Sequence, residues 1–154
     1  GIRQAVKLHI GHDPILRFNP NVTREVLEGG EKVSYQAELL RSQFCLSAPG
    51  MGFGVRLIDY VAAACIPVVI RPGKLRLPFE PDLDYDEFAV SIPFAEIGTL
   101  PKRLREMSEA VLRQKRERLK EVHTLFLWDH AYGKAYETAR EHVMRRLNAT
   151  TRAN

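Results

Sequence analysis

Three glycines and two charged residues in the middle of the chain have the types and spacing of a phosphate-binding turn. Gly50, Gly52 and Gly54 follow a short apolar segment and precede an amphipathic one. Backbone N–H groups at a helix N-terminus attract anions, and open α/β sheets bind ligands at the carboxyl ends of their strands. Arg56 adds a guanidinium there, and Asp59 lies three residues further on the same helix face, where it could accept from ribose hydroxyls.

The spacing of these glycines argues against two well-known nucleotide sites. A dinucleotide turn needs G-x-G-x-x-G, whereas the third glycine falls one position early here. The acid that should bind the ribose about 20 residues further on is also missing, because the next predicted strand ends at Ile70-Arg71. A Walker loop is excluded, since no Gly-Lys-Ser/Thr follows. A generic backbone-amide cradle for phosphate remains, and its alternative is a tight turn that binds no ligand.

Arg56 lies at an electrostatically unfavourable position, because the helix dipole disfavours a cation in the first turn by about 0.3–1 kcal/mol. A bound diphosphate would reverse that sign, and a guanidinium suits phosphate geometry. The alternative is a surface arginine screened by solvent. Asp59 could likewise be an i,i+3 partner of Arg56 with no role in binding.

The other residues with chemical potential suggest little. Cys45 and Cys65 are predicted to be buried free thiols, with a disulfide as the alternative, and this pair alone cannot build a metal site. The five histidines have no metal-ligand spacing with one another or with cysteine. His12 and Asp13 form a polar pair in a predicted loop and are the remaining candidates for catalysis.

Apolar patterning places the turn in a strand–helix–strand unit. We predict a strand over 43–47, a turn over 48–54, a helix over 55–64 and a strand over 66–70. The fold class is therefore α/β, with a Rossmann-like parallel sheet in a single domain, 1–154, closed by C-terminal helices.

Further elements flank this unit. Helices are predicted over 2–10, 34–41 and about 132–147, strands over 15–18 and 88–92, and an irregular, surface-exposed link over 71–87. In the helix 34–41 we expect Ala37, Leu39 and Leu40 to face inward. Trp128 is expected to be a core anchor between two C-terminal helices. The helical region after Pro93 carries an apolar stripe: Leu104, Met107, Val111, Leu112, Leu119, Val122, Leu125 and Phe126.

Bulk composition is that of an ordinary globular domain. The 154 residues are 45% hydrophobic and 27% charged, with a net charge of +4. No apolar run approaches the roughly 18–20 residues needed to span a bilayer, and no signal-peptide pattern is visible. The basic residues of 102–121 alternate with acids opposite the apolar stripe, which predicts a solvated face and no nucleic-acid partner. Sequons at Asn21 and Asn148 permit a secretory-pathway location.

The same residues carry a resemblance to a known family. An ordered series of short motifs resembles the C-terminal half of exostosin-type glycosyltransferases, with plant and algal members most similar. These motifs are Gly1-Ile2-Arg3-Gln4, Phe44-Cys45-Leu46-x-x-Pro49-Gly50, Arg56-Leu57-x-Asp59, Cys65-Ile66-Pro67-Val68-Val69-Ile70, Leu77-Pro78-Phe79, Leu83-Asp84-Tyr85-x-x-Phe88-Ala89-Val90 and Phe126-Leu127-Trp128.

The resemblance implies a GT-B architecture, in which 1–154 would be the C-terminal nucleotide-sugar-binding domain. It implies inverting transfer from a nucleotide sugar, commonly a UDP-sugar, in the synthesis of a polysaccharide or glycoprotein glycan. The location would be the Golgi lumen, in a type II membrane protein whose anchor lies outside this chain. The expected partners are the nucleotide-sugar donor, a glycan acceptor and an N-terminal domain. That domain would supply the general base, so this chain alone would be incomplete as a catalyst.

Site roles follow from the same resemblance. Gly50, Gly52 and Gly54 would shape the diphosphate turn, Arg56 would offset the charge of the leaving diphosphate, and Asp59 would hold the ribose. Family members often have Glu at the position of Asp59, and many have glycine where this chain has Ala64. No metal or other cofactor is expected, because GT-B enzymes generally stabilise the diphosphate with side chains and helix dipoles.

Two alternatives remain open. The first is a non-catalytic nucleotide- or glycan-binding module of the same fold. The second is a dinucleotide-dependent oxidoreductase, against which the early third glycine and the missing ribose acid argue.

Overall fold

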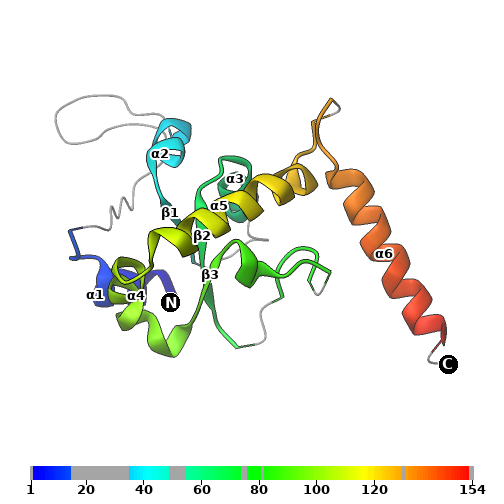
Figure 1. The fold of residues 1–154 in the computed structure, drawn as a ribbon. Coiled ribbons are helices and arrows are strands. Elements are labelled where there is room, and N and C mark those ends of the chain that lie inside the picture. Colours follow the sequence, from blue (N-terminus) through cyan, green and yellow to red (C-terminus); the bar gives the residue numbers. More distant parts are fainter. Residues whose placement is uncertain are drawn as a thin grey trace.

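A parallel β-sheet forms the centre of the molecule (Figure 1). The computed structural model describes residues 2–14, 35–48, 55–73, 76–80, 82–129 and 131–152. The three strands lie in the order β1 (Phe44–Ser47), β2 (Ile66–Arg71) and β3 (Val90–Pro93), and both neighbouring pairs are parallel. The central strand β2 is buried from Ile66 to Ile70. An unbroken apolar run of this kind is typical of a strand covered on both faces.

Helices cover both faces of this sheet. The described helices are α1 (Ile2–Ile10), α2 (Tyr35–Arg41), α3 (Val55–Ala62), α4 (Leu100–Arg105), α5 (Glu109–Val122) and α6 (Ala135–Arg152), with short 3-10 helices η1 (Tyr85–Glu87), η2 (Phe94–Thr99) and η3 (His123–Phe126). On the face of Val68, α1, η2 and α4 build one core. On the opposite face, that of Val69, α3 and the second half of α5 build another.

The strand–helix–strand prediction is confirmed, with boundaries that shift by one or two residues. The strand predicted over 15–18 lies outside the described residues, and so does most of the turn predicted over 48–54. The helix predicted over 34–41 is present as α2, but only Leu39 of its apolar residues is fully buried. Leu40 is 73% exposed, so its predicted inward orientation is wrong: successive residues of a helix point about 100° apart, and α2 packs on the core through Leu39.

The link between β2 and β3 is irregular, as predicted, but it is not all at the surface. Leu77, Leu83 and Tyr85 are buried in the core on the Val69 face of the sheet. Two parallel strands need a crossover that covers the sheet between them, and a helix usually provides it. Here the irregular link contributes those apolar side chains itself. β3 consequently begins at Val90, later than predicted.

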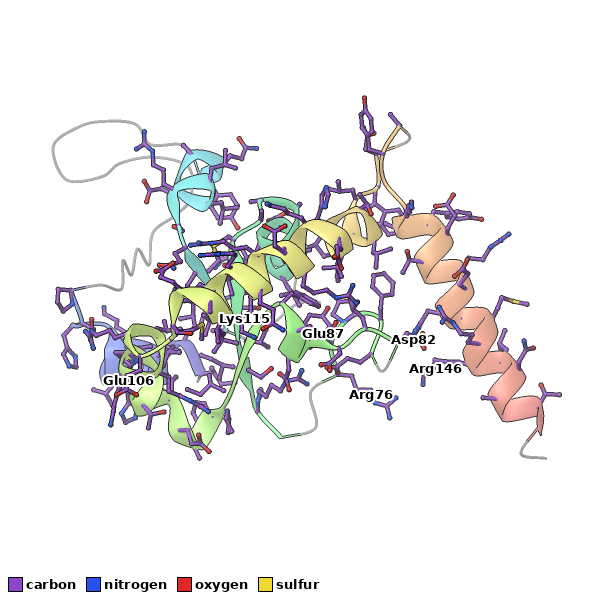
Figure 2. All side chains as sticks on the ribbon, in the orientation of Figure 1. Arg76, Asp82, Glu87, Glu106, Lys115 and Arg146 are labelled. Carbon is purple, nitrogen blue, oxygen red and sulfur yellow. A yellow bond between two sulfur atoms is a disulfide. The ribbon has the colours of Figure 1, made fainter. Side chains whose placement is uncertain are left out.

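Lys115 of α5 ties that helix to the entry of β3. Its Nζ donates to the carbonyl oxygens of Asp86 at 2.6 Å and of Ala89 at 2.8 Å, and Figure 2 shows it close to the sheet beside Glu87. Burial lowers the pKa of the Lys115 ammonium. Arg118, one turn further on, donates to Glu87 at 2.6 Å. These contacts fix α5 across the sheet, while its remaining basic residues face solvent as predicted.

The C-terminal stripe is buried in part. Leu104, Leu112, Leu119, Val122 and Phe126 are buried, but Val111 is 40% exposed. The aromatic anchor at the end of the stripe is Phe126. Its ring packs edge-to-face on that of Phe79, with the two ring centroids 5.3 Å apart.

The prediction that Trp128 anchors the core is wrong, because its side chain is 64% exposed. It follows the last buried residue of the stripe, where the chain leaves the core. There the N–H of Ala135 donates to the carbonyl of Leu127, and α6 then runs out from the rest of the molecule (Figure 1). A contact of 2.6 Å between His142 and Asp82 ties the middle of α6 to the β2–β3 link.

Candidate nucleotide-binding site

The carboxyl ends of the three parallel strands form the edge where the predicted site lies. β1 ends at Ser47, and α3 begins eight residues later at Val55. The glycines predicted to cradle a diphosphate, Gly50, Gly52 and Gly54, lie between them and outside the described residues. Their role therefore stays a prediction, and the site is described from α3 onward.

Packing of α3 sets the direction of its charged side chains. Leu57 is 2% exposed and Val61 is fully buried, so this face of the helix rests on the sheet. Arg56 and Asp59 lie three residues apart, beside that buried face. Arg56 is exposed in the first turn, where α3 has no acidic residue. No described residue makes a hydrogen bond or an ion pair with Arg56.

Asp59 is partly buried and is held from another helix. The hydroxyl of Tyr35, at the start of α2, donates to Asp59 Oδ2 at 3.4 Å. Among the described residues, no ion pair joins Asp59 to Arg56. The alternative in which these two residues simply neutralise each other is therefore not the arrangement that the structure has. The guanidinium and the carboxylate are both presented at the same end of the sheet.

A disulfide lies in the buried cluster that Tyr35 borders. Cys45 in β1 and Cys65 just before β2 are bonded, with their Cα atoms 5.8 Å apart. The expectation of two free thiols is therefore wrong. Both sulfurs are buried in a small cluster with Leu39 of α2 and Tyr60 of α3. The bond joins the two ends of the segment that contains the glycine-rich turn and α3.

Tyr60 fixes α3 against β1. Its hydroxyl donates to the carbonyl of Leu46 at 3.2 Å. Burial raises the pKa of both Tyr35 and Tyr60 above the usual tyrosine value, and Asp59 adds to the shift of each. Both hydroxyls therefore keep their protons at neutral pH and act as hydrogen-bond donors.

The end of α3 is a Schellman motif, a six-residue turn that closes a helix through a left-handed residue. The N–H of Cys65 donates to the carbonyl of Tyr60, and the N–H of Ala64 donates to that of Val61. Ala64 is the left-handed residue, with φ 55. Glycine adopts this conformation without steric cost, whereas an alanine there is strained.

Replacing Ala64 with glycine is accordingly expected to raise the free energy of unfolding by about 1 kcal/mol, because it removes the strain of a left-handed alanine. Chemical denaturation of the purified protein would measure this. The matched control is Ala63→Gly, which should lower stability, because Ala63 has no positive φ. Equal losses in both variants would contradict the strain at Ala64.

A second strained loop follows β2 at the same edge of the sheet. Phe79 has φ 64, which is uncommon for a bulky residue. Arg71, the last residue of β2, donates to Glu80 Oε1 at 2.7 Å, and Glu80 Oε2 accepts from the N–H of Leu77 at 2.9 Å. Tyr85 adds a hydrogen bond to the carbonyl of Pro78 at 3.0 Å. These bonds tie the segment 77–80 to the end of β2 and to η1.

The remaining candidates from the sequence have structural roles or no visible role. Asp13 Oδ1 accepts a hydrogen bond from Arg105 Nη2 of α4 at 2.6 Å, so this carboxylate ties the segment after α1 to α4. His12, the neighbouring residue, is exposed. Over the described ranges, no group of three or more histidine, cysteine or acidic side chains is placed to hold a metal ion. Across the same ranges, no helix combines the length and apolar character that crossing a membrane requires.

Sequence reasoning missed Tyr35 and gave the disulfide only as the alternative to two free thiols. The contact of Tyr35 spans 24 residues of sequence and has no local signature. The disulfide had a partial signal, because Cys45 lies in one predicted strand and Cys65 directly precedes the next. Phe44 faces Ile66 in the β1–β2 register, which brings Cys45 close to Cys65.

Fold and site together define an α/β domain built on a three-stranded parallel sheet, with Arg56 exposed in the first turn of α3. Comparison with known families identifies it further: the Exostosin GT47 domain family matches residues 4–107. The chain belongs to this family, and the resemblance seen in its motifs is confirmed. The matched region contains the whole sheet and α3 and ends just before α5.

Three curated proteins are similar to parts of the chain. A "probable glucuronoxylan glucuronosyltransferase" of Arabidopsis thaliana is 36% identical over 43% of this chain and 15% of its own length. An "Exostosin-1 homolog" of Caenorhabditis elegans is 26% identical over 75% of this chain and 28% of its own length. A "probable glucuronosyltransferase" of Oryza sativa subsp. japonica is 32% identical over 44% and 16%. The chain thus spans less than a third of each of these relatives.

Proposed function

We propose that this chain is the donor-binding domain of an inverting glycosyltransferase that uses a nucleotide sugar, most simply a UDP-sugar. The observation that carries the proposal is the exposed Arg56 in the first turn of α3, without a partner among the described residues. A cation at that place opposes the helix dipole unless an anion binds there. A diphosphate is such an anion, and it would be the leaving group of a nucleotide-sugar donor.

The chemistry assigned to each residue follows from charge and position. The acceptor hydroxyl attacks the anomeric carbon of the sugar, and the bond to the nucleoside diphosphate breaks with its electron pair. Arg56 would offset the charge that grows on the departing diphosphate. Backbone N–H groups of Gly50, Gly52 and Gly54 would cradle the same phosphates. Asp59, partly buried and already oriented, would accept from a ribose hydroxyl. No metal is required in this scheme.

The names of the relatives narrow the choice of sugar donor to be tested. Two of them are described as probable glucuronosyltransferases, which makes UDP-glucuronic acid the first donor to test. The acceptor would be a glycan chain. Within a GT-B arrangement, an N-terminal domain would face the carboxyl edge of this sheet and supply the general base that inverting transfer needs.

The disulfide supports a location in the secretory pathway. Disulfides persist in oxidising compartments and are rare in the cytosol. The buried Cys45–Cys65 bond therefore fits a lumenal domain, and we propose the Golgi lumen, with a membrane anchor elsewhere in the protein.

A release assay tests the proposal. The full-length protein is incubated with UDP-glucuronic acid, UDP-glucose or UDP-N-acetylglucosamine and a glycan acceptor, and free UDP is measured. We expect UDP release that depends on both donor and acceptor. UDP binding without any turnover would favour the non-catalytic module. Failure to bind any uridine nucleotide, together with binding of NADH, would overturn the proposal in favour of an oxidoreductase.

A further inference from the structure

Asp59 is oriented by a residue that belongs to a different helix. Tyr35 lies at the start of α2, and its half-buried hydroxyl donates to Asp59 Oδ2 at 3.4 Å. No described residue donates to the other oxygen, Oδ1. One carboxylate oxygen is thus occupied by the protein, while the other remains available to a ligand.

The support behind Tyr35 is rigid. Leu39 of α2 packs with the Cys45–Cys65 disulfide and Tyr60 in one buried cluster, and Tyr35 borders this cluster. The disulfide joins β1 to the start of β2. The hydroxyl of Tyr60 donates a hydrogen bond to the carbonyl of Leu46 in β1. α2 is therefore attached to the same frame that carries α3.

Protonation of Tyr35 makes its contact directional. Its burial raises the pKa of the Tyr35 hydroxyl, and nearby Tyr60 and Asp59 raise it further. The hydroxyl therefore stays protonated at neutral pH and serves Asp59 only as a donor. Such a bond limits rotation of a short carboxylate side chain, which has two free torsions.

We propose that Tyr35 is a positioning residue for nucleotide recognition: it holds Asp59 Oδ2, so that Oδ1 is presented to a ribose hydroxyl of the donor. This inference rests on the proposed function, because it assumes that Asp59 contacts the ribose. Fixing a carboxylate before the ligand arrives reduces the ordering cost of binding. Tyr35 should therefore affect selectivity for the ribose hydroxyls and not the binding of the diphosphate.

Selectivity between two ligands isolates this effect. UDP and 2′,3′-dideoxy-UDP share the base and the diphosphate and differ only in the ribose hydroxyls. The readout is the ratio of their dissociation constants, measured by calorimetry on the full-length protein. A variant that merely loosens the fold changes both constants and leaves their ratio unaltered.

We expect the wild type to prefer UDP by at least about ten-fold, and Asp59→Asn to lose most of this preference. Tyr35→Phe removes one hydroxyl and should lower the ratio about five-fold while binding of dideoxy-UDP changes little. The double variant should match Asp59→Asn, because Tyr35 acts only through Asp59.

Tyr85→Phe is the matched control. It also removes one hydroxyl that donates to the protein, here to the carbonyl of Pro78, but Tyr85 belongs to the core on the other side of α3. The ratio of the dissociation constants of UDP and dideoxy-UDP should be the same in Tyr85→Phe as in the wild type. Thermal unfolding of both variants reports any loss of stability separately.

The outcomes separate the two proposals. A wild type that prefers UDP, together with a Tyr35→Phe ratio equal to the wild-type ratio, overturns the role of Tyr35 and leaves the proposed function intact. A further drop on adding Tyr35→Phe to Asp59→Asn also overturns it, because Tyr35 would then contact the ligand itself. A wild type that binds neither ligand overturns the proposed function and this inference with it.

Discussion

Replacing Arg56 with alanine is expected to weaken UDP binding by the full-length protein between about 10-fold and 100-fold, which is the usual size of a charge-assisted hydrogen bond. The side chain is exposed and forms no hydrogen bond or ion pair with any described residue, so its loss should cost the fold nothing. Removal of a cation from the first turn of α3 should even raise the stability of the unliganded protein slightly. Titration calorimetry and thermal unfolding of the same preparations measure the two effects.

Two further variants sharpen this test. Arg56→Lys keeps the charge but lacks the planar fork of donors, so its affinity should fall between those of the wild type and Arg56→Ala. Arg116→Ala is the matched control, because Arg116 is an exposed arginine on α5. A large loss of stability without a change in UDP affinity in Arg56→Ala would contradict the assigned role, since it would make Arg56 a structural residue.

Removing the disulfide is expected to have the second large effect. The double variant Cys45→Ala/Cys65→Ala should lose about 3 kcal/mol of unfolding free energy, because the bond closes a loop with a sequence separation of 20 in the unfolded chain. For a domain of this size the midpoint of thermal unfolding should fall by about 10 °C. Urea denaturation with and without reductant measures the change.

The same experiment has an internal control. Reductant should destabilise the wild type and have no effect on the double variant. Free-thiol titration of the denatured, unreduced wild type should detect neither cysteine of this pair. Two reactive thiols there, or a double variant as stable as the wild type, would restore the earlier prediction of two buried free cysteines.

Much of the fold around the site was predictable because its signals are local. The apolar run Ile66–Ile70 has the length and content of a covered strand, and Leu57 and Val61 repeat at helical spacing. The position of Arg56 and Asp59 at the start of one helix follows from these two patterns alone. The end of α3 was less predictable, because it depends on the left-handed conformation of Ala64.

Features that depend on tertiary contacts could not be predicted from the sequence. Tyr35 reaches Asp59 from another helix, and nothing in the residues around it marks this contact. The spacing of Cys45 and Cys65 suits a disulfide and free thiols equally well until the strand register is known. Trp128 has the large apolar side chain typical of a core residue. Phe126, two positions earlier, is the residue that is buried in the core, and the indole of Trp128 is exposed.

The central claim is that the glycine-rich turn and the first turn of α3 bind the diphosphate of a nucleotide-sugar donor. Hydrogen–deuterium exchange of the full-length protein, with and without saturating UDP, tests it most directly. We predict that UDP slows exchange of the backbone amides in peptides covering 48–62, and that NADH at the same concentration does not. UDP-dependent protection confined to other segments, with exchange in 48–62 unchanged, would contradict the claim.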